Sequence, residues 1–340
     1  TATTQNYTLS LHDALPILKR HFSFIILIIC LLIAGSITAQ LPKNRTTSTI
    51  IADALSQLPA ANSDQYRELF AGLTATGEEG LMQLINRLNP AEKGSNAAIE
   101  FAIGGWTHFV ASNEKLRLSS AKTFAAALQT NRDNYIRAFL IRQLEFIGGV
   151  ESVATLSSFL NNDELAHPAA QALAALNNPT ADSALLEALK QPASPTLQIA
   201  LINAVGHTAN PEAELELLNK LKQFDATSTE ISLTSKTSAA IDKVILSALS
   251  KCGSKLSLPF VEKKVAEANY QYDNTNALAS YILLIERVAS LGDHKAAEKA
   301  AKQLMSSAAK AGNNEARIAA LTLQMKLPQA NQPGIVKKAM

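Results

Sequence analysis

Cysteine is almost absent from this sequence, which holds only Cys30 and Cys252 in 340 residues. Cys30 lies in a segment that we expect to be removed by processing, so one thiol remains and an intrachain disulfide is excluded. A lone cysteine of this kind is usually a small packing residue. Because Cys252 precedes Gly253 at the end of a predicted helix, we expect its side chain to be half-buried.

Charge of one sign and aromatic residues are also scarce. The formal net charge is +2, and no basic face stands out, which excludes the electrostatic footprint of a nucleic-acid-binding protein. Aromatic residues make up 5% of the chain, and runs of the β-branched and aromatic residues that favour strands are rare. Leucine and alanine dominate the apolar residues, which make up 47% of the chain. This composition predicts an all-α protein.

Motifs that carry chemistry are missing as well. Outside the segments expected to be lost, the histidines are His108, His167, His207 and His294, and no two have the i, i+3 or i, i+4 spacing of helical metal ligands. The chain has no H-E-x-x-H, no G-x-S-x-G and no phosphate-binding glycine loop. We therefore predict no catalytic residue, no metal ligand and no cofactor. His167 and His207 lie near predicted helix ends, where we expect capping or solvated roles.

Two stretches leave alternatives open. In the predicted helix 97–110, Gly104 and Gly105 would let a neighbouring helix approach closely. Trp106 and His108 could line a ligand pocket, but we favour the interpretation that Trp106 fills the core and His108 is partly exposed. The oxygen-rich stretch 273–276 lacks the acidic final ligand of a calcium loop and is interpreted as a turn.

The beginning of the chain contains two segments that we exclude from the fold. The stretch from Ser10 to Ile17 resembles the translation of a common sequencing adapter, so we interpret residues 1–17 as an assembly artefact. Residues 18–39 have the layout of a secretory signal peptide, with two basic residues, an apolar run and small residues before an expected cleavage after Ala39.

The apolar run of this segment, from Phe22 to Ala34, is shorter than the roughly 20 residues that span a bilayer. We therefore expect an exported protein, located in the periplasm, in the cell envelope or outside the cell, which meets the membrane only through the signal peptide during export. A retained membrane anchor is the alternative.

A fixed step of 29 residues organises the middle of the chain. The step relates two sets of apolar residues, which are Leu144, Leu173 and Ile202, and Ile147, Leu176 and Val205. It also relates the predicted turn residues Gly148, Asn177 and Gly206. A period of this size is typical of stacked helical repeats, in which one pair of helices cannot bury its apolar face alone. The sequence therefore predicts an α-solenoid of stacked antiparallel helix pairs.

Apolar spacing and capping residues place the individual helices. We predict an N-terminal helical region over 40–115 and a repeat solenoid over 116–340. Ser63 is expected to cap one helix. The predicted ranges are 49–58, 64–70, 81–88, 97–110, 116–128, 134–147, 151–160, 167–176, 180–190, 196–205, a helix after Asn210, 239–250, 258–269, 277–291, 295–309 and 314–327.

The regular step ends after Phe224. Residues 225–238 are rich in serine and threonine, and a loop of that length is either functional or disordered. The sequence also lacks the polar capping repeat that usually ends a solenoid. We therefore expect that the chain is a fragment and that more protein follows Met340.

If the solenoid has a binding surface, we expect it on the inner face, formed by the second helix of each pair. The 29-residue step stacks Arg142 and Gln171 with Ala200 in one column, and Glu145 and Asn203 with Ala174 in another. Our candidate contacts are Arg142, Gln171, Asn203 and Glu145. Because these columns are mostly small or neutral, they favour a protein or glycan-associated partner over a strongly charged one. An ordinary solvated face is the alternative.

The block from Asn134 to Leu221, with its repeated Gly-Gly, Asn-Asn-Pro and Asn-Pro turns, resembles HEAT and HEAT-like repeats of the armadillo type. The stretch from Asn44 to Ala60 and the repeats after it resemble the amino-terminal region of large exported bacterial proteins that carry a jelly-roll 3-keto-disaccharide hydrolase domain. This second resemblance implies a helical module attached to a carbohydrate-active protein, and no catalytic residue is transferred because no jelly-roll sequence is present.

Two functions follow as hypotheses. The first is a non-catalytic exported scaffold that binds a protein partner or positions a fused domain. The alternative is the accessory arm of a carbohydrate-active enzyme of the 3-keto-disaccharide hydrolase type, which would meet carbohydrate through that other domain.

Overall fold

The computed structural model describes residues 45–131, 133–227 and 235–327. Over these residues the chain forms sixteen α-helices and two short 3₁₀ helices, and it contains no strand. The all-α prediction is confirmed. The predicted artefact at 1–17 and the predicted signal peptide at 18–39 lie outside the described residues.

The helices form two layers. The first-helix layer consists of the even-numbered helices α2 (Thr47–Gln57), α4 (Gly77–Ile85), α6 (Glu114–Thr130), α8 (Val153–Ser157), α10 (Pro179–Lys190), α12 (Glu214–Thr227), α14 (Leu258–Glu267) and α16 (His294–Lys310). The second-helix layer consists of the odd-numbered helices α3 (Ser63–Thr74), α5 (Ala97–Val110), α7 (Asn134–Ile147), α9 (Ala166–Ala175), α11 (Pro195–Thr208), α13 (Ser235–Cys252), α15 (Ala277–Ser290) and α17 (Asn314–Lys326). The 3₁₀ helices η1 (Val150–Ser152) and η2 (Pro211–Ala213) lead into α8 and α12.

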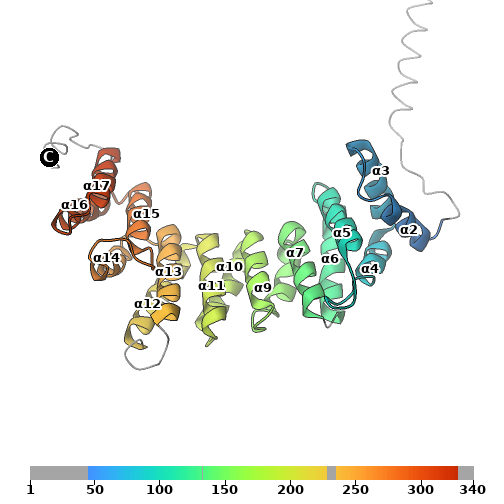
Figure 1. The fold of residues 1–340 in the computed structure, drawn as a ribbon, viewed down its shortest axis with the longest axis horizontal. Helices are drawn as coiled ribbons and strands as arrows, with labels where there is room; N and C mark the ends of the chain where they lie inside the picture. The colour runs from blue at the N-terminus through green and yellow to red at the C-terminus, as the bar shows by residue number, and fades with distance from the viewer. Residues whose placement is uncertain (1–44, 132, 228–234, 328–340) are drawn as a thin grey trace, which may run out of the picture.

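Contacts run between neighbours along the chain. Each odd-numbered helix contacts the next odd-numbered helix, from α3 to α17, and the even-numbered helices do the same from α2 to α10. Figure 1 shows the result as a row of helices in chain order, with α2 and α3 at one end and α16 and α17 at the other. The predicted boundary near residue 115 does not interrupt this row, because α4 and α5 contact α6.

Side-chain caps fix the starts of the central helices. Asp133, Asn178 and Ser194 each accept a hydrogen bond from the backbone amide of the third residue after them, at distances of 3.0, 3.0 and 3.3 Å. These bonds satisfy amides that have no partner within the helix. The predicted cap at Ser63 is wrong, because Ser63 is the first residue of α3. The capping residue is Asn62, whose Oδ1 atom accepts hydrogen bonds from the backbone amides of Asp64 and Gln65.

The predicted turn residues fill different roles. Gly148 ends α7, and Asn177 has a left-handed φ of 49°. Gly206 is not a turn residue, because α11 continues to Thr208 and the left-handed residue is Ala209, with a φ of 52°. A Cβ atom on Gly206 would lie 2.9 Å from the Cβ atom of Ala248 in α13. Close approach of two helices, and not a turn, requires glycine there.

The predicted loop at 225–238 is too long. The helix α12 continues to Thr227 and α13 begins at Ser235, so only residues 228–234 lie outside the described helices. These helix ends could not be predicted because the serines and threonines of the segment have only a weak preference against helix, which packing overrides.

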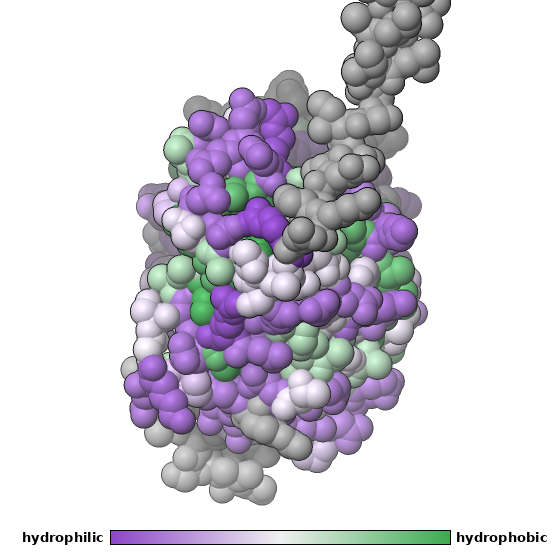
Figure 2. Space-filling model, turned by 90° about the vertical axis from the view of Figure 1, so that its right-hand side faces the viewer, coloured by the Kyte–Doolittle hydropathy of each residue, from purple (hydrophilic) through white to green (hydrophobic). Residues whose placement is uncertain are grey.

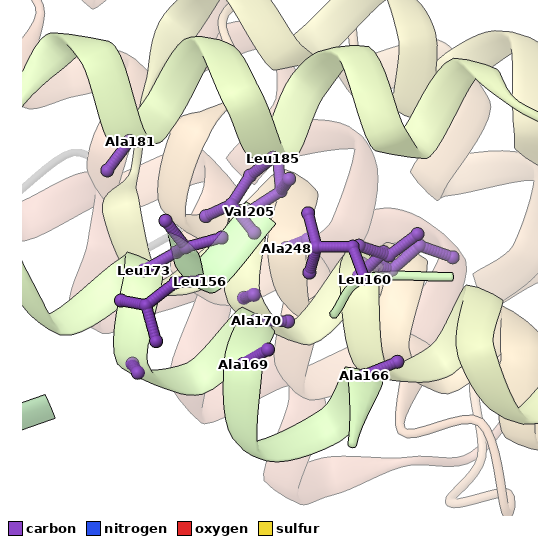
Figure 3. Packing of buried hydrophobic residues seen from close by; sticks show 14 of the residues in the cluster. Leu156, Leu160, Ala166, Ala169, Ala170, Leu173, Ala181, Leu185, Val205 and Ala248 are labelled. Atoms are coloured by element: carbon purple, nitrogen blue, oxygen red, sulfur yellow. The ribbon is translucent and has the colours of Figure 1, made fainter. Parts of the chain in front are cut away.

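Buried apolar residues form one continuous cluster from Ile51 to Leu327. Its centre is rich in alanine, and Ala166, Ala169 and Ala170 of α9 are at most 1% exposed. Figure 3 shows these alanines together with Leu156, Leu160 and Leu185 of the same buried cluster. Small side chains of this kind let helix axes approach to about 8 Å, the short end of the usual range.

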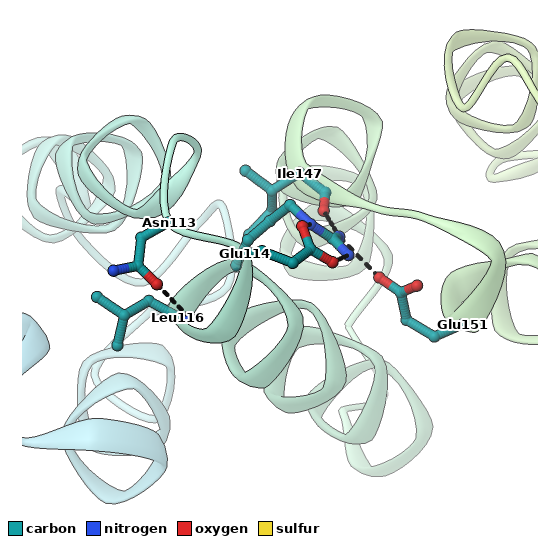
Figure 4. Close-up of polar contacts among 6 residues, drawn as sticks. Asn113, Glu114, Leu116, Ile147 and Glu151 are labelled. Carbon is teal, nitrogen blue, oxygen red and sulfur yellow. Dashed lines mark hydrogen bonds and ion pairs between the residues drawn. The ribbon is translucent and has the colours of Figure 1, made fainter.

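A half-buried polar cluster ties α6 to the next pair (Figure 4). The Nη1 atom of Arg117 donates to the backbone oxygen of Ile147 and to Oε1 of Glu151, the latter at 2.8 Å. Its Nε atom donates to Oε2 of Glu114 at 2.8 Å. These partners raise the pKa of Arg117, the hydrogen bond with Glu114 most of all. The guanidinium therefore joins the end of α7 and the 3₁₀ helix η1 to α6.

A second polar cluster plays the same part further along the row. The buried Oε1 atom of Glu214 accepts from the amide and hydroxyl of Ser254, at 2.7 and 3.1 Å, and from the hydroxyl of Ser257 at 2.6 Å. The Nε atom of Arg287 donates to the backbone oxygen of Gly253 at 2.8 Å. Both clusters satisfy backbone groups at the turn that follows a second-layer helix.

Replacing Arg117 with methionine is expected to destabilise the protein by about 2 kcal/mol, because the Glu151 carboxylate and the Ile147 carbonyl lose a charged donor in a half-buried site. The measurement is the midpoint of urea unfolding followed by circular dichroism. Arg67→Met is the matched control, since that guanidinium is 71% exposed and pairs with Asp64 within one helix, an interaction worth less than about 0.5 kcal/mol. Equal losses in the two variants would contradict the proposed role of Arg117.

The adjacent glycines of α5 give a second test. A Cβ atom on Gly105 would overlap the buried ring of Phe70, whereas one on Gly104 would meet no atom within 4 Å. We expect Gly105→Ala to destabilise the protein by about 1–3 kcal/mol through overpacking.

The neighbouring change Gly104→Ala should instead stabilise the protein by about 0.5–1 kcal/mol, because alanine is the better helix former. Thermal unfolding of both variants distinguishes the two effects. A Gly105→Ala variant as stable as the unchanged protein would show that the packing of Phe70 does not require a glycine at position 105.

Candidate functional site

The second-helix layer carries a groove across three consecutive helices. It has a volume of about 420 Å³, and its lining residues come from α7, α9 and α11. They are Glu145, then His167, Gln171, Ala174 and Ala175, then Ala200, Asn203, Ala204 and His207. We call this the α7–α9–α11 groove.

The groove brings together three of the four predicted contact residues, Glu145, Gln171 and Asn203. The fourth, Arg142, lies three residues before Glu145 on α7 and is exposed, but it is not among the lining residues. The 29-residue step therefore aligned equivalent positions on successive helices, but it did not show where the groove ends.

One hydrogen bond fixes the polar side of the groove. The Nε2 atom of Gln171 donates to Oε1 of Glu145 at 2.9 Å, which joins α9 to α7. This bond sets the orientation of the Gln171 amide and leaves its oxygen able to accept a hydrogen bond. Asn203, one helix further along, is exposed and presents a second amide.

His167 and His207 were predicted to lie near helix ends, and neither was among the four predicted contact residues. Both side chains are exposed and line the groove. His167 lies four residues before Gln171, and His207 lies four residues after Asn203, so each shares a helix face with a column residue. That spacing is the signal in the sequence that would have found them.

A second feature of the same layer is an aromatic surface on α5 and α7. Phe101, Tyr135 and Phe146 are 48%, 40% and 54% exposed. The hydroxyl of Tyr135 donates to Oε1 of Glu100 at 2.6 Å, and the ring of His108 lies 4.5 Å from that of Phe146. These two contacts bring the exposed sides of α5 and α7 together, and we call Phe101, His108, Tyr135, Arg142 and Phe146 the aromatic face.

The spacing along each helix supports this grouping. His108 follows Phe101 by seven residues, and Arg142 follows Tyr135 by the same number, which is close to two helical turns. At the end of the molecule shown in Figure 2, hydrophilic residues cover most of the surface and hydrophobic residues form patches between them. Among the described residues, three of the four large exposed aromatic side chains, Phe101, Tyr135 and Phe146, lie on α5 and α7.

Trp106 and His108 do not share a pocket. Trp106 is 2% exposed, and its Nε1 atom donates to Oγ of Ser120 in α6 at 2.9 Å. The favoured interpretation of Trp106 as a core residue is confirmed. His108 is exposed on the aromatic face.

Other candidate groups have structural explanations. Cys252 is 1% exposed, so the expected half-buried side chain is fully buried. The stretch 273–276 is a turn, in which the amide of Asn276 donates to the backbone oxygen of Asp273 at 3.2 Å. In the ranges that the structure describes, no group of three or more His, Cys, Asp or Glu residues could hold a metal ion. No helix in those ranges is long and apolar enough to cross a membrane.

Comparison of the chain with protein-family models and with curated protein sequences gives no match. The likeness to HEAT repeats and to hydrolase-associated helical regions thus stays a prediction.

The buried thiol gives a pH-dependent prediction. Burial raises the pKa of Cys252 from its usual value of 9.0 to about 11. Between these pH values the unfolded chain releases the thiol proton while the folded chain keeps it. The stability that is present below pH 9 is therefore lost as the pH rises towards 11, by about 1.4 kcal/mol per pH unit for one proton.

Urea unfolding of the protein and of Cys252→Ala, each measured at several pH values from 8 to 11, tests this linkage. We expect a shallower loss of stability in the variant, whatever its stability at pH 8. Parallel curves would show that Cys252 does not titrate differently in the folded protein.

Proposed function

We propose that this chain is a HEAT-like α-solenoid that works as a non-catalytic scaffold and binds a protein partner, or a fused domain, on the aromatic face. The solenoid is supported by eight successive helix pairs, by the contacts between neighbouring odd-numbered helices and by the continuous core. In this proposal residues 18–39 direct export, and the scaffold has no cofactor.

The observation that carries the proposal is the clustering of exposed rings. Among the described residues, the aromatic side chains that are large and exposed are Phe101, Tyr135, Phe146 and Tyr272. Three of the four lie on the aromatic face, in a chain that has few aromatic residues and leaves most of the described ones buried or half-buried. Protein interfaces are enriched in Tyr, Phe and Arg, and these residues supply much of the binding energy.

Two of the three rings are held in place before any partner arrives. Tyr135 is fixed through its hydroxyl by Glu100, and Phe146 is contacted by His108. Side chains that are already ordered lose less conformational freedom on binding. Tyr135 and Phe146 therefore keep an exposed apolar surface at low entropic cost.

Arg142 adds a charged contact to the same face. Its side chain is exposed and makes no ion pair with another described residue. Its planar guanidinium can bind a carboxylate of the partner with two parallel hydrogen bonds. An aromatic surface beside such a donor fits a partner that combines apolar and acidic groups.

Site-specific photo-crosslinking in the native host tests the proposal. A photoreactive phenylalanine analogue at position 146 should give one adduct of defined mass, identified by mass spectrometry. The matched control carries the analogue at position 215, because Leu215 is 65% exposed but lies on α12 of the other layer. We expect no adduct from the control.

A second variant tests the energetic role of the face. With the analogue at position 101, the double change Arg142→Ala and Phe146→Ala should reduce the adduct about tenfold or more, as expected for central interface residues. Equal labelling from positions 146 and 215, or no labelling from either, would overturn the proposed binding surface. Glycoside hydrolysis by the purified chain would overturn the non-catalytic role.

A further inference from the structure

We infer that the α7–α9–α11 groove is a binding site for a short, uncharged, hydroxyl-rich ligand, that is, an oligosaccharide of a few linked rings. No residue of the aromatic face is among the lining residues of the groove, so this inference does not depend on the proposed protein partner. It rests on the size of the groove, on the chemistry of its lining and on the fixed Glu145–Gln171 contact.

The groove has the dimensions of a small-ligand site. Its volume of about 420 Å³ falls in the range of roughly 300–1,000 Å³ found for ligand pockets. The 29-residue step makes His167 of α9 equivalent to Thr196 of α11. Thr196 lies eleven residues before His207 on the same helix. The two imidazoles are therefore about 16 Å apart along the helices, which gives an elongated site with a histidine at each end.

The lining combines small apolar groups with neutral hydrogen-bonding groups. Ala174, Ala175, Ala200 and Ala204 contribute methyl groups that can lie against the C–H face of a sugar ring. The amides of Gln171 and Asn203 both donate and accept hydrogen bonds, as a neutral imidazole does, and the Glu145 carboxylate accepts. Because each sugar hydroxyl can donate and accept, this mixture matches a chain of hydroxyl groups.

Charged ligands fit the same lining poorly. The groove has no lysine or arginine among its lining residues, so an anion would find no permanent positive charge and would face the carboxylate of Glu145. A cation would find only that carboxylate, which already accepts from Gln171. Removing an ion from water without a matching charge is costly.

A peptide is also a poorer match. Extended peptides are recognised by backbone hydrogen bonds together with pockets for alternate side chains. The four alanines on this part of the second-helix layer provide methyl groups only and no side-chain pocket. An oligosaccharide does not need such pockets, because its specificity comes from the positions of its hydroxyl groups.

Titration calorimetry with maltotetraose, cellotetraose and chitotetraose, each up to about 10 mM, tests the inference on the purified chain. We expect at least one of them to bind with a Kd of about 1 mM or lower, an affinity at the weak end of specific binding. The double change Gln171→Ala and Asn203→Ala should weaken that binding at least tenfold. The control Asn219→Ala, an exposed asparagine on α12 of the other layer, should leave it unchanged.

Circular dichroism of the variants confirms that a loss of binding is not a loss of fold. Binding of none of the three saccharides, or equal binding to the groove variant, would overturn the inference. Tighter binding of an uncharged alanine–serine octapeptide would overturn it in favour of a peptide site. Phe101→Ala should weaken crosslinking on the aromatic face and leave saccharide binding unchanged, so failure of one proposal is distinguishable from failure of the other.

Discussion

The fold depends on one constraint, which is that the helix pairs described by the structure must stack on their neighbours to bury their apolar surface. The pairs are short, and their apolar residues face both the partner helix and the next pair. Alanines such as Ala169 and Ala170, and the close approach of Gly206 to Ala248, bring successive second-layer helices together. Side chains on their outer faces therefore line up from one helix to the next, and this alignment creates the groove and the aromatic face.

The same constraint explains the positions of the buried polar groups. Close stacking covers the turns between pairs, where backbone amides and carbonyls would lose their contact with water. Arg117 and Arg287 donate to carbonyls at such turns, and Glu214 accepts from Ser254 and Ser257 in the turn before α14. Burying an unpaired backbone group is unfavourable, so a charged side chain with several partners is a stable solution at these places.

The local features of the fold could be predicted from the sequence. The helices 97–110 and 134–147 have the predicted limits, because apolar spacing and caps such as Asp133 act over a few residues. Features that depend on other helices could not be predicted. The glycine at 206 follows the 29-residue step but serves helix approach, and the ends of α12 and α13 extend into a stretch of weak helix formers.

The candidate site could likewise be predicted only where it depends on the local repeat. Repetition in the sequence identified Glu145, Gln171 and Asn203 as neighbours on one surface, although it also included Arg142, which lies outside the groove. The repeat could not reveal the aromatic face, because the 29-residue step does not relate Phe101 to Phe146. Their proximity depends on the packing of α5 against α7.

The position of Trp106 has a consequence for how this protein can be observed. It is the sole tryptophan of the chain, and it is buried with its ring N–H bonded to Ser120. In an array whose units contact mainly their neighbours, different units can open separately. Tryptophan fluorescence therefore reports the junction of α5 and α6 alone, beside the aromatic face, while circular dichroism reports the whole array. A difference between the two signals would measure how far cooperativity extends along the molecule.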